Sequence, residues 1–330
     1  MTSHLVPFSR CQVFTEKDTV LAWNPISHIS GFLFAASILA CGAKGIVSLG
    51  GIPADQFVNI VNEFQITTLC AFPTSFQKLV LVLETMHVQV PSLKRVVMCG
   101  GLTTQALFQR ITKVFQLDSL RNGYGISEAA GFISITPPDD IGYRSVGHPL
   151  PNMQFKVLDT STRAKLGPGE WGELVFRGPS VMSCYHNRQE ATAEVLSDDG
   201  WFRSGDLGYY DETGRFFIVE RLKDMIKCMD QQLAPAEIEN LLMSHEGVAE
   251  AAVVGIPNED FGEAPTAFVV LKEGYQGSVT QDQLKEVVAS QSASYKHLHG
   301  GVFYINAIPK TDTGKYLRRK LRDQHLKQQL

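Results

Sequence analysis

The residues of this chain that could carry chemistry stand in short runs that contain glycine. One run, Asn122-Gly123-Tyr124-Gly125-Ile126-Ser127-Glu128, places a tyrosine between two glycines, followed by a hydroxyl and a carboxylate. Glycines let a backbone approach a flat ligand closely, and the hydroxyl and carboxylate can meet a phosphate and its Mg²⁺. A glycine turn with a buried tyrosine explains the same run. The run is not a dinucleotide fingerprint, because Glu128 stands where a third glycine would be.

A second run, Ser204-Gly205-Asp206-Leu207-Gly208, sets one carboxylate between glycines. Such a carboxylate can accept hydrogen bonds from two neighbouring ribose hydroxyls, although a turn aspartate gives the same pattern. Arg221 follows across a hairpin predicted around residues 212–214, which could return it to the same ligand. A solvated charged face is the alternative for the run 220–227.

Two further candidates are a lysine and a histidine. Lys315 ends the loop Pro309–Lys315, and an ammonium is a compact charge suited to a carboxylate and a phosphate together. The loop is not a phosphate-binding Walker A loop, because its first glycine is absent and Tyr316 follows the lysine. An exposed turn lysine, with a basic stretch beyond it, is the alternative. His28 precedes a predicted buried helix, where a histidine is often structural.

The predicted secondary structure that must position these residues changes along the chain. Strands predicted at 67–72 and 93–99 alternate with helices at 76–86 and 104–115, which favours a parallel sheet with crossover helices. After residue 130, proline and glycine punctuate short strands at 154–158 and 172–177, which is typical of a small β subdomain.

From about residue 222 the pattern predicts a compact α+β unit. Helices are expected at 236–244 and 281–290, and strands at 250–255, 265–271 and 301–306. The predicted fold class is therefore α/β: a partial large domain (1–221, with 1–130 α/β and 131–221 β-rich), then a C-terminal α+β domain (222–330).

Composition limits the classes of function. The formal net charge of -4 argues against a nucleic-acid-binding surface. The apolar stretch 31–43 is shorter than the roughly 20 residues of a membrane span, and the first residues lack the apolar core of a signal peptide. Six scattered cysteines without a C-x-x-C pair are typical of reduced thiols in an intracellular protein.

The order of these runs resembles the adenylate-forming (ANL) superfamily, in the branch of acyl-CoA synthetases, 4-coumarate–CoA ligases and firefly luciferase. The resemblance extends from about residue 20 to residue 325. Besides the glycine–tyrosine run, the matching motifs are Gly172–Pro179, Ser204–Gly208, Glu220–Lys227, Ala234–Glu239 and Pro309–Lys315. The resemblance implies that the protein is an ATP-dependent acid–thiol ligase. A fatty or aromatic carboxylic acid and ATP, with Mg²⁺, would give an acyl-adenylate, which CoA then converts to acyl-CoA, leaving AMP.

The resemblance also implies roles for particular residues. The nucleotide would contact the segment of Asn122, Gly123, Tyr124 and Gly125, with Tyr124 on adenine, and also Ser127 (α-phosphate), Glu128 (Mg²⁺), Asp206 and Arg221 (ribose). The reacting groups would contact Lys315, which stabilises developing charge, Lys227, Gln232 and the acyl-pocket residues His28, Gly100 and Gly101. Lys223 matches the hinge about which the C-terminal domain rotates.

Several features depart from the family pattern. The Ser/Thr/Gly-rich phosphate loop has no counterpart, so we expect an N-terminally truncated member whose sheet has an exposed edge and apolar surface. A non-catalytic remnant or a nucleotide- or acyl-binding protein is the alternative. Asp230 stands where the family has glycine, and its carboxylate would repel the phosphates of CoA, which argues against thioester formation. The C-terminus Gln328-Gln329-Leu330 is not the peroxisomal Ser-Lys-Leu address, so a cytoplasmic location is expected.

Overall fold

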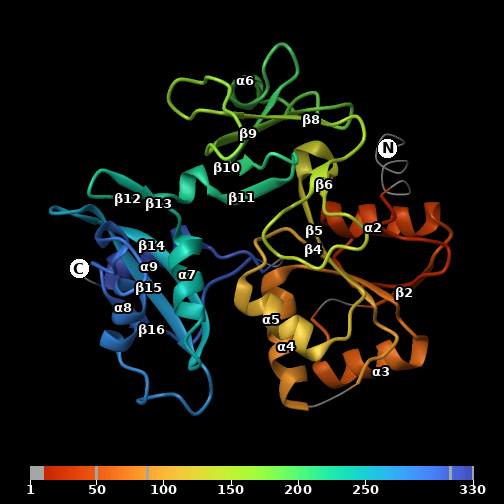
Figure 1. Ribbon diagram of the computed structural model, residues 1–330, viewed down its shortest axis with the longest axis horizontal. Coiled ribbons are helices and arrows are strands. Elements are labelled where there is room, and N and C mark those ends of the chain that lie inside the picture. Colours follow the sequence, from red (N-terminus) through yellow and green to blue (C-terminus); the bar gives the residue numbers. More distant parts are fainter. Residues whose placement is uncertain (1–10, 49–50, 87–88, 312–313, 329–330) are drawn as a thin grey trace. The chain divides into compact units, whose positions relative to one another are not determined.

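The computed structural model describes residues 11–48, 51–86, 89–311 and 314–328. The predictions about the first residues and about the C-terminal address lie outside these ranges. The chain divides into two compact units, Met1–Ile218 and Val219–Leu330 (Figure 1). The chain passes from one unit to the other within strand β11 (Phe216–Arg221). Each unit is described by itself.

The first unit is built around a seven-stranded mixed sheet. Its strands lie in the order β2 (Lys44–Val47), β1 (Thr19–Ala22), β3 (Thr68–Ala71), β4 (Arg95–Cys99), β5 (Ser119–Ile126), β6 (Gly131–Ile135) and β7 (His148–Pro149). The first five pair in parallel, whereas β6 and β7 are antiparallel. The predicted α/β class is therefore confirmed. Val47 of β2, at the end of the sheet, is 86% exposed.

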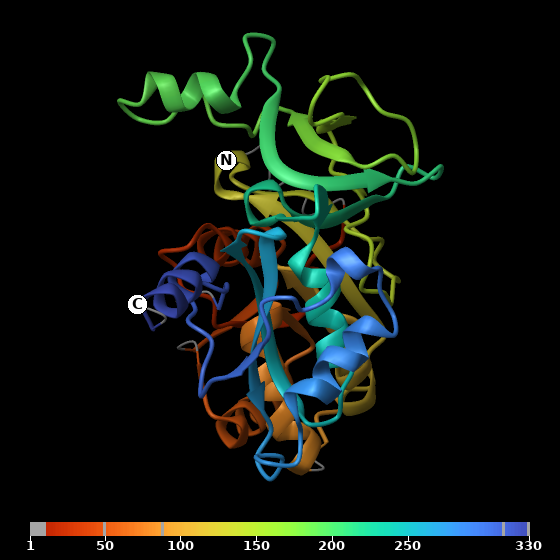
Figure 2. The same cartoon turned by 90° about the vertical axis from the view of Figure 1, so that its left-hand side faces the viewer.

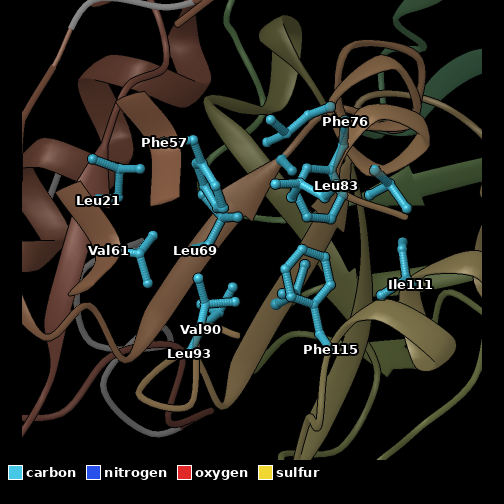
Figure 3. Packing of buried hydrophobic residues seen from close by; sticks show 14 of the residues in the cluster. Leu21, Phe57, Val61, Leu69, Phe76, Leu83, Val90, Leu93, Ile111 and Phe115 are labelled. Atoms are coloured by element: carbon cyan, nitrogen blue, oxygen red, sulfur yellow. The ribbon is translucent and has the colours of Figure 1, made fainter. Parts of the chain in front are cut away.

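Four helices connect the parallel strands as crossovers and cover the sheet. They are α2 (Ile29–Ala40), α3 (Ala54–Phe64), α4 (Pro73–Met86) and α5 (Gln105–Val114). On one face α3, α4 and α5 bury a core that includes Phe57, Leu69 and Phe76 (Figure 3). The rings of Phe76 and Phe115 stack there with centroids 5.8 Å apart. Burying each such side chain contributes about 1.5–3 kcal/mol.

The opposite face of the sheet packs on α2. Alternate strand residues point to the two faces, so Val96 and Met98 join the first core while Val97 and Cys99 join the second, beside Phe34 of α2. The apolar stretch that is too short for a membrane span thus forms a packed helix. Among the described residues, no helix is long and apolar enough to cross a membrane. All six cysteines are free thiols.

The rest of the first unit is a small β subdomain, as predicted. Its four-stranded antiparallel sheet has the order β11, β10 (Phe202–Tyr210), β9 (Gly172–Arg177) and β8 (Gln154–Leu158), with α6 (Gln189–Val195) beside it. The pairing of β10 with β9 shifts register between Arg203 and Leu207. A bulge of this kind bends a strand, and the bend is visible in the green strand of Figure 2.

The second unit is the predicted α+β fold. Its five-stranded sheet contains β13 (Gln231–Leu233), β12 (Ile226–Cys228), β15 (Gly262–Leu271), β14 (Val248–Asn258) and β16 (Val302–Tyr304). Its helices are α7 (Pro235–Met243), α8 (Gln281–Ala289) and α9 (Arg318–Gln328), with 3-10 turns η2 (Leu222–Asp224) and η3 (Ser294–Lys296). Figure 2 shows α7 and α8 on one face of the sheet and α9 on the other. Helix α8 begins with the capping box of Thr280 and Gln283.

Candidate nucleotide and acyl site

The fold brings Tyr124 and Asp206 together from distant parts of the first unit. The hydroxyl of Tyr124 donates a 2.5 Å hydrogen bond to Oδ2 of Asp206, 82 residues further along the chain. Asp206 is 3% exposed and lies in the bulged part of β10, where Gly205 has φ +68°. The Ser204 hydroxyl accepts the amide of Asp206 and donates to the Leu174 carbonyl, which fixes the bulge. Bulges commonly re-aim a side chain at a functional site.

Most of the glycine–tyrosine run forms a strand and not a glycine turn. Asn122–Ile126 belongs to strand β5, and only Ser127 and Glu128 leave it, in the turn η1 (Ser127–Ala129). A Cβ on Gly123 would lie 2.7 Å from the Phe132 ring, and one on Gly125 would lie 2.1 Å from the Gly131 carbonyl oxygen. These glycines therefore allow β5 to approach β6, which is a packing reason for their presence.

Asn122 is held by hydrogen bonds within the protein. Its side-chain oxygen accepts from the Thr103 hydroxyl at 2.9 Å, and its side-chain nitrogen donates to the Gly142 carbonyl at 2.7 Å. Its backbone amide donates to the hydroxyl of Thr136. These bonds brace the strand that carries Tyr124, and the predicted contact of Asn122 with a nucleotide remains a prediction.

Ser127 and Glu128 begin the turn that follows β5. Oε1 of Glu128 accepts a 2.7 Å hydrogen bond from the hydroxyl of Tyr185, and its backbone carbonyl accepts from Met182 at 2.7 Å. Burial, and then the bond to Glu128, raises the pKa of Tyr185 to about 12. Sequence reasoning missed Tyr185, because nothing local connects it with a glutamate 57 residues earlier.

Glu128 fits a magnesium ion that arrives with a nucleotide. Within the described part of the chain, no group of three or more His, Cys, Asp or Glu side chains could hold a metal. Magnesium usually keeps several waters and binds one or two carboxylates together with substrate phosphates. The Glu128 carboxylate is a ligand of the type used in that binding mode, and its contact with Mg²⁺ stays a prediction.

The residues predicted to form an acyl pocket lie close to Phe72. His28 is the N-cap of α2, where its Nδ1 accepts from the Ser30 amide, and its ring contacts Phe72 edge-on at 5.6 Å. A Cβ on Gly100 would lie 2.7 Å from the Phe72 ring, and Gly101 lies beside Pro73. The structure thus gathers His28 and Gly100 around one aromatic ring, which sequence reasoning did not single out.

In the second unit, the structure pairs Lys227 with Gln232. They are directly opposed in the hairpin of β12 and β13, and both are exposed. Opposed residues of an antiparallel pair share a face, with Cβ atoms about 5 Å apart. The two-residue turn, Met229-Asp230, has φ +52° and +58°. That left-handed conformation favours glycine and tolerates aspartate, so Asp230 keeps the turn and adds a carboxylate at its tip.

The remaining candidates of the second unit lie on two short segments. Arg221 ends β11, and its amide donates to Oε1 of Glu220 at 3.0 Å; the exposed Lys223 follows within η2. Lys315 is exposed in the loop that closes at the bridge between Lys310 and Tyr316. Its amide donates to the Thr311 hydroxyl at 3.0 Å.

The basic stretch after Lys315 is only partly exposed to solvent. Arg319 has a side chain that is 95% exposed, whereas Arg318 is mostly buried against two carboxylates, Glu220 and Glu239. Burial raises the pKa of Glu239 to about 7, although Arg318 opposes the shift. Sequence spacing does not reveal this cluster, because its members come from three separate elements.

Comparison with known proteins defines the class. The model of the AMP-binding enzyme family matches residues 1–186, and that of the AMP-binding enzyme C-terminal domain matches residues 237–315. The chain therefore belongs to the AMP-binding enzymes, within the adenylate-forming superfamily. This confirms the resemblance that the sequence motifs suggested.

Among the curated relatives of this chain are luciferases and 4-coumarate–CoA ligases. The chain is 35% identical to luciferin 4-monooxygenase of Photinus pyralis over 304 residues, covering 92% of this chain and 55% of the relative. It is also 35% identical to probable 4-coumarate–CoA ligase 3 of Dictyostelium discoideum over 319 residues, covering 94% and 56%. The chain thus spans about half the length of the curated relatives it matches.

Solved structures show the same fold. ATP-bound MatB from Rhodopseudomonas palustris matches with a TM-score of 0.87 and 26% identity, over 98% of this chain and 63% of that one. The o-succinylbenzoate CoA synthetase MenE from Bacillus subtilis, in complex with an acyl-adenylate intermediate, matches with a TM-score of 0.82 and 26% identity. That match covers 97% of this chain and 64% of that one.

Proposed function

We propose that this chain carries the site of an ATP-dependent acid–thiol ligase. In the first step a carboxylate oxygen attacks the α-phosphorus of ATP, and the bond to the bridging oxygen breaks, releasing pyrophosphate. In the second step the sulfur of CoA attacks the acyl carbon, AMP leaves, and the thiol proton passes to solvent. The observation that carries the proposal is the hydrogen bond between Tyr124 and Asp206, because it joins the two nucleotide motifs of the first unit.

Tyr124 and Asp206 would bind the nucleoside. The Tyr124 ring gives adenine a stacking surface, and its hydroxyl fixes the carboxylate of Asp206. A carboxylate offers about four acceptor positions, which suits it to two neighbouring ribose hydroxyls. Arg221 would contribute to the same ribose, and Gly123 and Gly125 keep β5 close enough to β6 to hold the tyrosine.

Ser127 and Glu128 would face the phosphates. The Ser127 hydroxyl can donate to the α-phosphate, and Glu128, oriented by Tyr185, would hold Mg²⁺. When bound, the ion neutralises charge on the phosphate oxygens. Lys315 would stabilise the charge that develops as the carboxylate meets the α-phosphate.

The thioester step would use the second unit. We infer that residues 222–330 act as the mobile C-terminal domain and 1–221 as the AMP-binding part, with Lys223 as hinge. Lys227 and Gln232, opposed in one hairpin, would act on the adenylate and thioester. His28, Gly100 and Gly101 would line the pocket of a fatty or aromatic acid, since Phe72 makes its wall apolar. The six free thiols support a reducing compartment such as the cytoplasm.

The first test is ATP–pyrophosphate exchange by the purified chain with Mg²⁺ and a mixture of fatty and cinnamic-type acids. We expect acid-dependent exchange that falls by about 10²–10³ in Lys315→Ala, because one stabilising charge is lost. Lys320→Ala is the matched control, since Lys320 is an exposed lysine of α9, and it should retain the wild-type rate.

The outcomes separate the two candidate functions. Exchange that ignores the acid, or that survives in Lys315→Ala, would contradict the ligase proposal. A folded chain without exchange that still binds AMP, and loses that binding in Asp206→Asn, would instead be a nucleotide-binding protein. Product analysis with CoA then decides whether the carboxylate of Asp230 at the hairpin tip is compatible with thioester formation.

A further inference from the structure

A buried ion cluster in the second unit lies directly behind the loop of Lys315. Arg318 stands in the first turn of α9, three residues beyond Lys315. Its Nη2 lies 2.9 Å from Oε1 of Glu239 and 3.7 Å from Oε2 of Glu220. The three side chains are 18%, 10% and 8% exposed. Removing one member of such a group leaves an uncompensated buried charge.

The two carboxylates of the cluster also accept hydrogen bonds from backbone amides of other elements. Glu220 accepts the amide of Arg221 at 3.0 Å and the amide of Ala236, in the first turn of α7, at 3.2 Å. The N-cap of α7, Ala234, has no side chain that could do this. Glu239 accepts the amide of Val253 in β14 at 2.8 Å. Through these bonds Arg318 is joined to the end of β11, to α7 and to β14.

A second ion pair holds the other side of the same loop. Lys310 pairs with Glu250 of β14 at 2.5 Å. The ring of Tyr316 lies 5.4 Å from Nζ of Lys310 and 5.7 Å from Cζ of Arg318, so two paired cations contact one ring. The bridge of Lys310 with Tyr316 closes the loop at this point.

We propose that Arg318 is a positioning residue that fixes the Lys315 loop relative to the strand that leads into the hinge at Lys223. The inference rests on the proposed function, in which Lys315 is the charged group of the first step. Lys315 belongs to the loop that the bridge of Lys310 with Tyr316 closes, so the base of that loop sets where its backbone lies. Arg318 holds that base to Glu220, three residues before Lys223, and the loop and the hinge strand therefore keep one geometry.

This role differs from general support of the fold. A displacement of about 1 Å at a reacting group can lower a rate about a hundredfold, whereas a residue that only stabilises the fold leaves the kcat of folded molecules unchanged. The kinetic signature of positioning is therefore a lower kcat for adenylation with an unchanged KM for ATP. A structural signature is faster hydrogen exchange of the amides that close the loop.

The experiment compares Arg318→Met and Arg318→Lys with Arg319→Met. Arg319 is the neighbouring arginine of the same helix, and its side chain is 95% exposed. ATP–pyrophosphate exchange gives kcat and KM, and hydrogen exchange reports on Thr311, which donates to the Lys315 carbonyl, and on Leu317, which donates to the Pro309 carbonyl. The amide of Ala267, in β15, is the internal reference.

We expect Arg318→Met to lower kcat about tenfold to a hundredfold, with KM for ATP within about twofold of wild type. The Thr311 and Leu317 amides should exchange faster while Ala267 is unchanged. Arg318→Lys should recover part of kcat, because one ammonium cannot reproduce the guanidinium fork. It also serves as the test if Arg318→Met does not fold. Arg319→Met should match wild type.

An Arg318→Met variant with wild-type kcat, or with loop amides that exchange at the wild-type rate, would overturn the proposal. A uniform increase in exchange that includes Ala267 would do the same, because it indicates a structural role only. Should the wild-type chain lack pyrophosphate exchange, the proposed function fails while the loop amides still decide whether Arg318 holds the loop.

Discussion

At the scale of single residues, the candidate site depends on polar side chains that the fold removes from water and pairs over long distances in sequence. Asp206 is nearly inaccessible and receives the hydroxyl of Tyr124. Arg318 reaches Glu239 across 79 residues. Buried polar groups of this kind are costly unless they are satisfied, so each pair is sensitive to the loss of either partner.

Glu239 should make stability depend on pH. Its pKa is raised from an ordinary 4.5 to about 7, chiefly by burial, and the neighbouring carboxylates Glu220 and Asp224 add to the shift, while Arg318 and the Val253 amide oppose it. Tyr316 also lies near, and its own pKa is raised, first by burial. Between pH 4.5 and about pH 7, Glu239 in the folded chain holds a proton that the unfolded chain has released. Stability therefore falls as pH rises through this window and levels off above it.

Thermal unfolding of Glu239→Gln across the same pH range checks this dependence. The amide does not titrate, so the fall in melting temperature on going from about pH 5 to about pH 7.5 should be smaller than in wild type. Glu237→Gln, at an exposed position of the same helix, is the control and should keep the wild-type slope. Equal slopes in all three proteins would show that Glu239 is ionised throughout.

At the scale of elements, the glycines of β5 are required by close packing. Gly125 pairs with Phe132 across β5 and β6, and a Cβ at position 125 would lie 2.1 Å from the Gly131 carbonyl oxygen. Backbone atoms cannot rotate away as a side chain can, so the strands would have to separate.

Gly125→Ala should therefore lower the free energy of unfolding by more than about 2 kcal/mol, as overpacking does. Gly142→Ala is the matched control, because its Cβ would meet only the Asp140 side chain at ordinary contact distance, 3.5 Å. Urea unfolding of both variants measures the difference. A Gly125→Ala variant as stable as Gly142→Ala would mean that β5 and β6 are not packed as described.

Most elements were predictable because their signals are local. Alternation of apolar runs with amphipathic stretches located β3, α4, β4 and α5, and proline with glycine marked the β subdomain. For the run 122–126 a glycine turn remained an alternative, because its glycines resemble turn residues when their partners, Phe132 and Gly131, are not known to lie against them. The buried state of Arg318 was not predictable for a similar reason, since Glu220 and Glu239 come from other elements.

The candidate site residues were assigned largely through the order of the motifs. The residues alone left a turn or a solvated face as an alternative for each run, and the structure adds the links between Tyr124 and Asp206 and between Lys227 and Gln232. The bond of Tyr185 to Glu128 and the place of Phe72 beside His28 depend on tertiary contacts, which no spacing in the sequence encodes.

At the scale of the whole molecule, the buried clusters described for the first unit share no residue with that of the second unit. The second unit buries side chains on both faces of its five-stranded sheet. One face includes Val254, Phe268 and Leu321, and buried residues such as Leu242 and Leu284 come from α7 and α8. The ion cluster of Arg318 also lies wholly within this unit. A unit of this size with its own core is the usual description of an independent domain.

The segment Val219–Leu330 should therefore fold when it is produced alone. We expect one cooperative urea transition, because the segment carries its own buried cluster of apolar side chains. Leu242→Ala should lower the free energy of unfolding by about 2–5 kcal/mol and so move the transition to lower urea, since Leu242 is fully buried. Asn240→Ala, at an exposed position of the same helix, should change this free energy by less than about 0.5 kcal/mol. A broad transition that Leu242→Ala leaves unchanged would mean that the second unit needs the first in order to fold.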